Sequence, residues 1–131
     1  MRIIKTQVRV RYAETDQMGV VYHANFLVWM EIGRVEYCRT VGLRYRDMEA
    51  DGVLLTVVEA QCRYLAPALY DQEVTIKTWL AGAHSRMVRF AYEFEADGNK
   101  LAEGETKHVF CDRGRKPRKL PEKYRSFFGI A

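Results

Sequence analysis

The sequence has no long uninterrupted run of apolar residues. Its longest mostly apolar stretch covers residues 19–30 and still contains His23 and Asn25, whereas a helix that spans a membrane needs about 20 apolar residues. The first residues also lack the apolar core followed by small residues that is typical of a secretory signal peptide. These two absences argue against a membrane span and against secretion, so we expect a cytoplasmic protein.

Cysteine is scarce, and its spacing is irregular. Cys38, Cys62 and Cys111 are far apart, and none belongs to a Cys-x-x-Cys pair. Disulfide frameworks and structural zinc sites use paired cysteines, so both are disfavoured. We expect three reduced thiols that are mostly buried.

Common catalytic constellations are also missing. His84 and His108 lie far apart, with no cysteine or carboxylate at metal-ligand spacing, so no metal site is expected. Ser85 and Ser126 are not part of a Gly-x-Ser-x-Gly nucleophile elbow. Cys38 has no identifiable partner base. The sequence therefore predicts neither metal catalysis nor a serine or cysteine nucleophile.

Composition favours one compact domain. The chain has 131 residues, of which 48% are hydrophobic and 29% are charged. A chain of this length buries roughly two-thirds of its extended surface when it folds. It has no internal repeat, no low-complexity block and no interdomain linker. We therefore predict a single domain over residues 1–131.

The net charge of +4 is unevenly distributed. From Asp112 to the end of the chain seven basic residues face two acidic ones, whereas the rest of the chain is nearly neutral. A basic tail of about residues 113–131 suggests an anionic partner, such as a phosphate on a small molecule, a nucleic acid or an acidic carrier protein. A solubilising tail without a partner is an equally good interpretation.

Hydrophobic periodicity predicts one strand followed by one long helix. From Ile4 to Tyr12 mainly apolar residues alternate with lysine, glutamine and arginine, which is the period of two of a strand with one buried face. From Asn25 to about Val41 there is no proline, and apolar residues form a broad stripe at helical spacing. Such a broad stripe suits a helix that is covered on most sides by a sheet.

The second half of the chain has the pattern of four antiparallel strands. They cover Leu54 to Leu65, Glu73 to Leu80, Met87 to Ala96 and Lys100 to Asp112, with turns at residues 82–85 and 97–99. Small residues such as Ala102 and Gly104 on the last strand allow a helix to lie close to it. We predict an α+β fold in which a curved five-stranded antiparallel sheet wraps a long central helix, with a short helix near residues 122–128.

The segment from Tyr12 to Asn25 holds the residues best suited to chemistry. The start of a helix presents backbone N–H groups without partners and a partial positive charge, which can stabilise an oxyanion. Asp16 lies just before the predicted helix and could act opposite it as a nucleophile or general base. An aspartate beside a turn is also a common turn former or cap, so the residues alone leave both roles open.

Two ordered motifs relate this segment to a known family. They read Arg9-Val10-x4-Thr15-Asp16-x2-Gly19-x-Val21-Tyr22-His23-Ala24-Asn25-Phe26 and Trp29-x-Glu31-x-Gly33-Arg34-x-Glu36. Together they closely resemble the 4-hydroxybenzoyl-CoA thioesterase family of hotdog-fold acyl-CoA thioesterases, and the predicted order of elements fits that fold. The tail motif Lys116-Pro117-Arg118-Lys119-Leu120-Pro121 resembles the bacterial short-chain acyl-CoA branch of the family.

The resemblance implies hydrolysis of an acyl-CoA thioester without a cofactor. Asp16 matches the family's catalytic aspartate, and the backbone N–H of His23 stands in the position that binds the thioester carbonyl. Further substrate contacts are expected from Gly19, Val21, Tyr22, Asn25 and Glu31. The CoA phosphates are expected to meet basic side chains, with Arg86, Arg89, Arg113, Arg115, Lys116 and Arg118 as candidates. Family members commonly build the site at a subunit interface, so a homo-oligomer, dimer or tetramer, is expected.

Several roles of individual residues stay open. Asn25 could cap the helix, and Glu31 and Arg34 could form a salt pair on the helix. Tyr22 could line the acyl pocket or simply pack. The imidazole of His23 could act as an acid or base. Glu31 is the runner-up nucleophile, because another hotdog branch uses a carboxylate on the helix.

Other functions of the same fold are also open. Hotdog hydratases and dehydratases resemble a histidine with a carboxylate on the helix, whereas Asp16 precedes the helix here. A non-catalytic acyl-binding or nucleic-acid-binding protein would use the basic tail, but aromatic residues are not interleaved with its bases, so no nucleic acid partner is expected. We prefer hydrolysis of a CoA or carrier-protein thioester, in which Asp16 either forms an acyl anhydride or activates water.

Overall fold

The computed structural model describes residues 2–130 of the chain. It contains the strands β1 (Ile4–Arg9), β2 (Leu54–Tyr64), β3 (Glu73–His84), β4 (Met87–Ala96) and β5 (Asn99–Cys111). Three helices accompany them, α1 (Asn25–Thr40), α2 (Tyr45–Ala50) and α3 (Glu122–Arg125), with short 3-10 turns at Tyr12–Glu14 and Ser126–Phe128. The predicted order of one strand, one long helix and four strands is confirmed.

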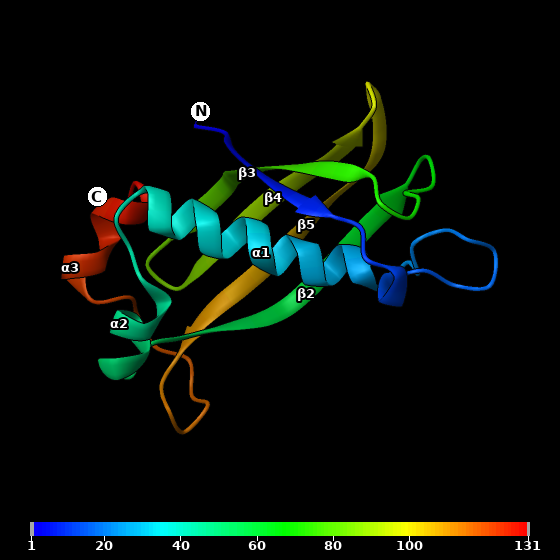
Figure 1. Ribbon diagram of the computed structural model, residues 1–131. Coiled ribbons are helices and arrows are strands. Elements are labelled where there is room, and N and C mark those ends of the chain that lie inside the picture. Colours follow the sequence, from blue (N-terminus) through cyan, green and yellow to red (C-terminus); the bar gives the residue numbers. More distant parts are fainter. Residues whose placement is uncertain (1, 131) are drawn as a thin grey trace.

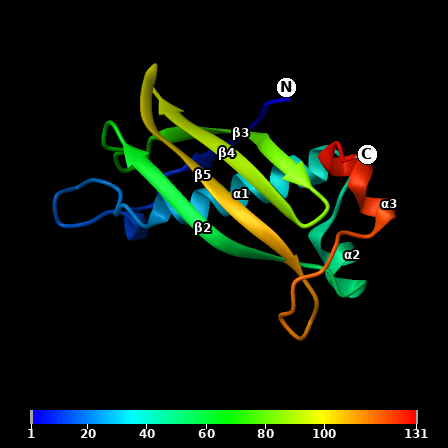
Figure 2. The same cartoon turned by 180° about the vertical axis from the view of Figure 1, so that it is seen from behind.

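The five strands form one antiparallel sheet in the order β1-β3-β4-β5-β2. The sheet curves around α1, which lies along its inner face (Figure 1). Seen from behind, the outer face of the sheet carries no helix in the described part of the chain (Figure 2). The predicted α+β architecture, a long helix wrapped by a five-stranded sheet, is therefore confirmed.

Glycines allow α1 to lie close to the sheet. A Cβ atom on Gly33 would come within 2.4 Å of Thr78 Oγ1, and a Cβ atom on Gly104 would lie 2.3 Å from the backbone oxygen of Gln61 and 2.5 Å from Met30 Cε. These distances are far shorter than a normal contact, so each crossing point requires a residue without a side chain. Apolar side chains from both layers complete the core, including Phe26, Trp29, Phe90, Phe94 and Phe110.

A chain of polar side chains is buried in the middle of this core. Arg34 donates from Nη1 to the Tyr92 hydroxyl at 3.2 Å. Tyr92 Oη lies 2.6 Å from Thr106 Oγ1, which lies 2.8 Å from His108 Nε2. The expected salt pair of Arg34 with Glu31 is wrong, because Arg34 lies on the buried face of α1 and turns inward, whereas Glu31 is exposed.

Two strand ends differ from the prediction. β1 is shorter than predicted, because the chain enters the first 3-10 turn after Val10 and leaves Tyr12 exposed. β3 is longer and includes residues 82–84, since a bulge after Leu80 keeps these residues paired with β4. The turn between β3 and β4 is therefore confined to residues 85–86.

The C-terminal basic segment is partly docked on the fold. Leu120, Tyr124 and Phe128 are buried against the core, so the residues after the cationic cluster are not a free tail. The predicted short helix near residues 122–128 is present as α3 and the second 3-10 turn. The helix α2 was not predicted, and it lies at the same end of the molecule as α3 (Figure 1).

The cysteines match the prediction of free and mostly buried thiols. Cys38 and Cys111 are buried, Cys62 is half-buried, and none forms a disulfide. Burial raises the pKa of Cys38 to about 12. This thiol is therefore protonated at neutral pH and is a poor nucleophile.

Candidate functional site

The segment that carries Asp16 forms a short closed loop at one end of the molecule (Figure 1). Asp16 N donates to Val20 O at 2.8 Å, and Gly19 N donates to Asp16 O at 3.0 Å. A β-bridge between Thr15 and Val21 forms the base of the loop. Gly19 has a φ of 79°, a left-handed conformation that glycine adopts without strain. The loop therefore needs a glycine at this position.

The Asp16 side chain is exposed at the rim of this loop. Its Oδ1 accepts a hydrogen bond from Met18 N at 2.8 Å, the pattern in which an aspartate stabilises its own turn. Its Oδ2 has no hydrogen-bond partner within residues 2–130. The carboxylate is thus oriented by one oxygen, and the other is available to a substrate or a water molecule.

The start of α1 supplies a free hydrogen-bond donor. Asn25 N donates to Tyr22 O at 2.9 Å, and Phe26 N donates to His23 O at 3.2 Å. His23 N has no acceptor in the described part of the chain, as is usual where a helix begins. A free N–H at the positive end of a helix can stabilise a developing oxyanion.

The expected role of Asn25 as the cap of this helix is wrong. Ala24 occupies the N-cap position and makes no side-chain hydrogen bond, because the helix already begins at Asn25. The Asn25 amide instead donates from Nδ2 to the backbone carbonyl of Glu14 at 3.0 Å. Asn25 therefore ties the helix start to the preceding 3-10 turn.

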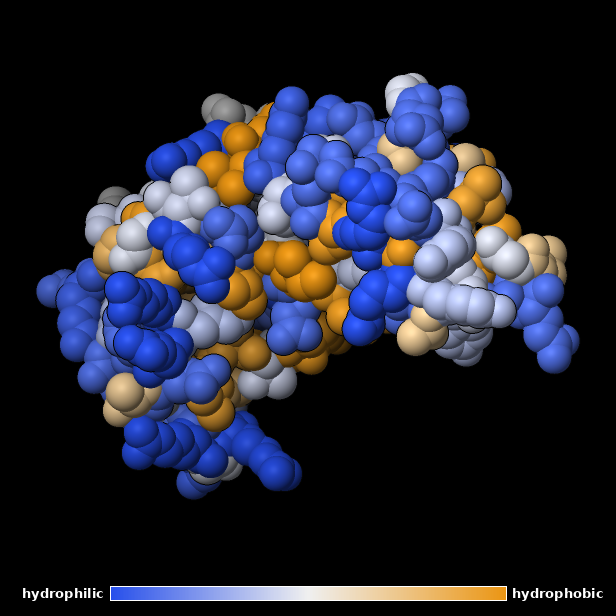
Figure 3. Space-filling model, viewed as in Figure 1, coloured by the Kyte–Doolittle hydropathy of each residue, from blue (hydrophilic) through white to orange (hydrophobic). Residues whose placement is uncertain are grey.

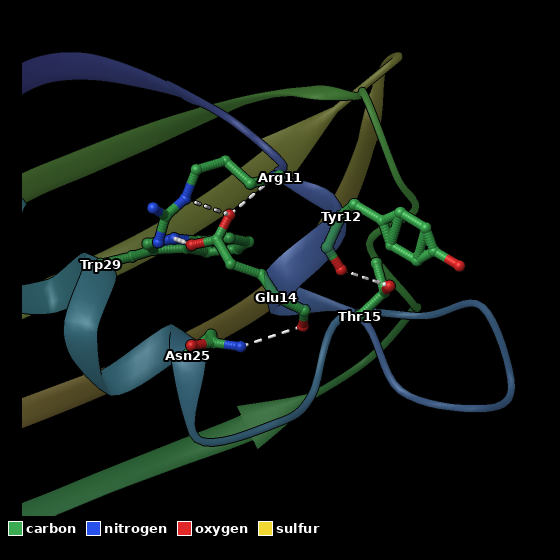
Figure 4. Close-up of polar contacts among 6 residues, drawn as sticks. All are labelled: Arg11, Tyr12, Glu14, Thr15, Asn25 and Trp29. Atoms are coloured by element: carbon green, nitrogen blue, oxygen red, sulfur yellow. Dashed lines mark hydrogen bonds and ion pairs between the residues drawn. The ribbon is translucent and has the colours of Figure 1, made fainter.

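Glu14, which the sequence did not single out, is a buried carboxylate two residues before Asp16. It is 7% exposed, belongs to the first 3-10 turn and faces α1 (Figure 4). Its carboxylate accepts hydrogen bonds from Arg11 N at 2.7 Å and from Trp29 Nε1 at 3.1 Å. These bonds compensate for the loss of water around a buried charge.

Aromatic side chains surround the start of α1. The ring centroids of Tyr22 and His23 are 4.6 Å apart, and those of His23 and Tyr64 are 6.1 Å apart. Tyr64, another residue that the sequence did not single out, donates its hydroxyl to His23 O at 2.9 Å. Burial raises the pKa of Tyr64 to about 12, so the hydroxyl keeps its proton at neutral pH and holds the His23 backbone from the side of β2.

The basic candidates lie at the opposite end of the molecule from Asp16. The segment 113–118 follows β5, and Arg86 lies in the turn between β3 and β4. Backbone hydrogen bonds join these two segments, because Phe110 N donates to Arg86 O and Leu120 N donates to Ser85 O. This end also carries α2 and α3 (Figure 1). One chain therefore does not bring Asp16 and the basic candidates together.

Two of the basic candidates are engaged with their own chain. Arg89 forms an ion pair with Glu105 at 2.9 Å on the outer face of the sheet. Arg113 donates to the carbonyls of Glu49 and Ala50 at the end of α2, at 3.1 and 2.9 Å. The exposed candidates whose side chains form neither an ion pair nor a hydrogen bond within residues 2–130 are Arg86, Arg115 and Lys116.

Glu31 lies on the exposed side of α1, beside a surface hollow of about 370 Å³. Tyr45, Met48 and residues 53–56 line the same hollow, so it is bounded by α1, α2 and the start of β2. Within residues 2–130 no three His, Cys, Asp or Glu side chains are grouped to hold a metal ion. None of the helices described is long and apolar enough to cross a membrane.

The sequence matches a known family over most of its length. The sequence model of the thioesterase-like superfamily matches residues 10–128, which include the Asp16 loop, α1 and most of the sheet. The chain belongs to the thioesterase-like superfamily. One similar member, YneP of Bacillus subtilis, is 38% identical over 114 residues, which are 86% of this chain and 83% of YneP. The acyl-CoA thioester hydrolase YbgC of Escherichia coli is 31% identical over 122 residues, which are 92% of this chain and 91% of YbgC.

A solved thioesterase structure shares the fold of this chain. The DHNA-CoA thioesterase of Staphylococcus aureus is 32% identical to this chain, with a TM-score of 0.89 over 92% of this chain and 82% of that one. The predicted family and its hotdog fold are therefore confirmed.

Proposed function

We propose that this chain hydrolyses acyl-CoA thioesters to a free acid and CoA. The observation that carries the proposal is the closed loop that holds Asp16 just before a helix start whose His23 N–H has no acceptor. The names of YbgC, an acyl-CoA thioester hydrolase, and of the Staphylococcus aureus DHNA-CoA thioesterase support the same reaction.

In the proposed mechanism the thioester carbonyl oxygen accepts a hydrogen bond from the His23 N–H. Asp16 either attacks the carbonyl carbon, which gives an acyl anhydride and releases the CoA thiolate, or takes a proton from a water molecule that attacks instead. The free N–H and the positive end of α1 stabilise the oxyanion that develops. Water opens the anhydride in the first route, so both routes end with the acid and the CoA thiol.

The side chains of Tyr22 and His23 have supporting roles in this proposal. The His23 ring packs between Tyr22 and Tyr64, while its backbone supplies the oxyanion donor. Tyr22 is 51% exposed and is free to contact the acyl group. Gly19 and Val21 close the loop that presents Asp16.

A second copy of the chain completes the site in our proposal. The strand β2 is an edge strand of 11 residues that exposes Val57, Val58 and Tyr64, and the exposed Leu65 follows it directly. A long edge strand with apolar side chains readily pairs with another strand. We infer a symmetric homodimer in which two copies of β2 pair antiparallel.

Antiparallel pairing of β2 brings opposite ends of two chains together. Tyr64, at the end of β2, contacts His23 of its own chain, whereas Leu54, at the start, pairs with Cys111 at the end of β5. In an antiparallel pair the start of one strand lies against the end of the other. The partner's basic segment, which follows its β5, therefore approaches the Asp16 end of the first chain.

In this arrangement one chain supplies the reacting groups around Asp16, and the other supplies the basic residues that bind the CoA phosphates. The exposed Arg86, Arg115 and Lys116 of one chain would bind the CoA phosphates by charge-assisted hydrogen bonds. The hollow beside Glu31 lies near the start of β2 and has apolar walls from Met48 and residues 53–56. It would hold the pantetheine or acyl part of a substrate that reacts at Asp16 of the other chain.

A tetramer of two such dimers is the larger assembly that we propose. The outward face of α1 exposes Leu27, Val28 and Ile32, and apolar atoms gather in this region (Figure 3). The outer face of the sheet instead carries ion pairs such as that of Lys77 with Glu95. Association through α1 buries this apolar surface, whereas association through the outer face of the sheet would bury ion pairs, so the α1 face is favoured.

Thioesters of an acyl carrier protein are the second candidate substrates. The basic segment 113–118 offers a charge that is complementary to an acidic carrier surface. We place either reaction in the cytoplasm, where the three free cysteines stay reduced.

The function is tested by thiol release from CoA and carrier-protein thioesters with short, long and aromatic acyl groups. Wild type is compared with Asp16→Asn, which keeps an oxygen for the Met18 N–H, and with Glu73→Gln, which changes an exposed carboxylate paired with Arg9. We expect kcat to fall at least about 100-fold in Asp16→Asn, the usual effect of losing an acid–base group, and to stay unchanged in Glu73→Gln. An unchanged kcat in Asp16→Asn refutes the role of Asp16, and no thiol release from any thioester refutes the function.

A further inference from the structure

Glu14 is a buried charge in an otherwise exposed region. It is 7% exposed, whereas the side chains of Tyr12, Asp16 and Met18 around it are exposed. Burying a carboxylate is unfavourable unless donors replace the water that it loses. A glutamate at this place therefore requires hydrogen-bond donors, and these come from Arg11, at the start of the first 3-10 turn, and from Trp29 on α1.

The Glu14 carboxylate joins the 3-10 turn to the second turn of α1. Its Oε1 accepts from Arg11 N at 2.7 Å, and Arg11 Nε lies 3.6 Å from the same oxygen. Its Oε2 accepts from Trp29 Nε1 at 3.1 Å. Trp29 is 1% exposed, so its indole is fixed by the core and gives the carboxylate a rigid anchor.

The Glu14 backbone carbonyl joins the same turn to the helix start. It accepts from Tyr22 N at 2.8 Å and from Asn25 Nδ2 at 3.0 Å. Tyr22 and Asn25 flank His23, whose N–H is the proposed oxyanion donor. Figure 4 shows the Glu14 carboxylate turned to Arg11 and Trp29 and the Glu14 carbonyl turned to Asn25.

Glu14 is thus the residue through which the Asp16 loop and the start of α1 are held in one geometry. We infer that Glu14 is a positioning residue, which sets the placement of the Asp16 carboxylate relative to the His23 N–H without touching the substrate. The inference rests on the proposed function. Misplacing a reacting group by about 1 Å can lower a rate about 100-fold. Loss of the contacts by which Glu14 fixes this geometry, two residues from Asp16, should therefore lower kcat.

The chemistry of the site explains why a glutamate is required. An ionised carboxylate only accepts hydrogen bonds, and here both of its oxygens face N–H donors. A glutamine side chain has one oxygen and one NH₂ group, so one of the two donors would face another donor. Glu14→Gln therefore keeps the size of the side chain and breaks one of its two bonds.

The test compares Glu14→Gln with wild type on a thioester that wild type hydrolyses. We expect kcat to fall about 10- to 100-fold while KM changes less than about twofold, because substrate contacts remain and only the reacting geometry is disturbed. Glu73→Gln, an exposed glutamate in an ion pair, is the matched control and should keep both constants. Unchanged kcat in folded Glu14→Gln overturns the inference.

Trp29→Phe tests the same hydrogen bond by removing its donor and leaves Glu14 unchanged. It removes the indole donor together with part of the buried ring, so kcat should fall in the same direction, and the double variant should lose less than the product of the two single losses. Fully multiplicative losses contradict a shared hydrogen bond. This variant also serves if Glu14→Gln fails to fold.

Hydrogen exchange separates this inference from the proposed function. The Tyr22 amide, which donates to Glu14 O, should exchange at least about tenfold faster in Glu14→Gln than in wild type, while the core amide of Phe90 keeps its rate. If wild type cleaves no thioester, the proposed function fails, but faster Tyr22 exchange still supports Glu14 as the residue that positions the loop. Unchanged Tyr22 exchange overturns the inference whether or not the protein is a thioesterase.

Discussion

Glu14 and Arg34 are both charged side chains that fold into the interior, and their surroundings are very different. The Glu14 carboxylate has two N–H donors and an ion pair with Arg11. Arg34 is 9% exposed, its hydrogen bond goes to the neutral Tyr92 hydroxyl, and it forms no ion pair within residues 2–130. The Glu14 charge is compensated by an ion pair and two N–H donors, whereas the hydrogen bond of Arg34 goes to an uncharged group.

The polar chain that begins at Arg34 contains no acidic group. A guanidinium only donates hydrogen bonds, so the Tyr92 oxygen accepts from Arg34. The Tyr92 hydroxyl also shares a hydrogen bond with Thr106 Oγ1, which in turn lies 2.8 Å from His108 Nε2. Within the described residues His108 Nδ1 has no partner. We therefore expect the compensated charge of Glu14 to fix local geometry and the uncompensated charge of Arg34 to lower stability.

The largest loss of folding stability is expected at acidic pH, in the polar chain that begins at Arg34. Burial, together with the charge of Arg34, lowers the pKa of His108 from 6.5 to about 3 in the folded chain. Between these values the unfolded chain binds a proton that the folded chain does not. Stability is therefore complete above pH 6.5 and falls by about 1.4 kcal/mol for each pH unit below it. Urea unfolding at pH 7, 5.5 and 4.5 measures this slope, and His108→Gln should flatten it; an equal slope in that variant assigns the acid sensitivity to other groups.

A smaller loss is expected from Tyr92→Phe. This change removes the hydroxyl that accepts from Arg34 and leaves a buried guanidinium without a partner, which costs about 2 to 3 kcal/mol. Chemical denaturation at pH 7 measures the loss. Tyr12→Phe, at a ring that is 76% exposed, is the control and should change stability by less than about 0.5 kcal/mol. Equal stabilities of the two variants would show that Tyr92 does not support the charge.

The smallest effect is expected from Arg34→Met. Replacing an uncompensated buried charge by an apolar side chain of similar length is often neutral or stabilising, and Tyr92 keeps its bond to Thr106. We expect the free energy of unfolding to change by less than about 1 kcal/mol. A loss above about 3 kcal/mol would contradict the view that the Arg34 charge is uncompensated, because Arg34 would then have a compensating anion or partner.

Much of the fold follows from local patterns, and the exceptions have physical causes. Apolar alternation with a period of two predicted strands, and the broad apolar stripe predicted α1. Both patterns arise because the sheet and the helix each bury one side against the other. The helix α2 was missed because its six residues include one fully buried side chain, Met48, too few to show a period. The early end of β1 depends on the first 3-10 turn, which is stabilised by Trp29 from a distant turn of α1 rather than by neighbours in sequence.

The candidate site was predictable to a similar extent. The position of Asp16 before a helix start is a local feature, and the motifs that surround it were found in the sequence. Glu14 was missed because no local pattern reveals its bond to Trp29. The location of Arg86 and residues 113–118 at the opposite end depends on strand order, which spacing along the chain does not reveal.

Mixed dimers distinguish a thioesterase site built from two chains from a site built within one chain. One chain carries Asp16→Asn and the other carries Arg86→Ala, Arg115→Ala and Lys116→Ala, with separate tags so that the mixed dimer can be isolated. In a site shared across the interface, one of the two sites in each mixed dimer has both functional ends intact, so kcat/KM should recover to about half of wild type while each parent homodimer stays far below it. A mixed dimer no more active than the average of its two parents would contradict the account.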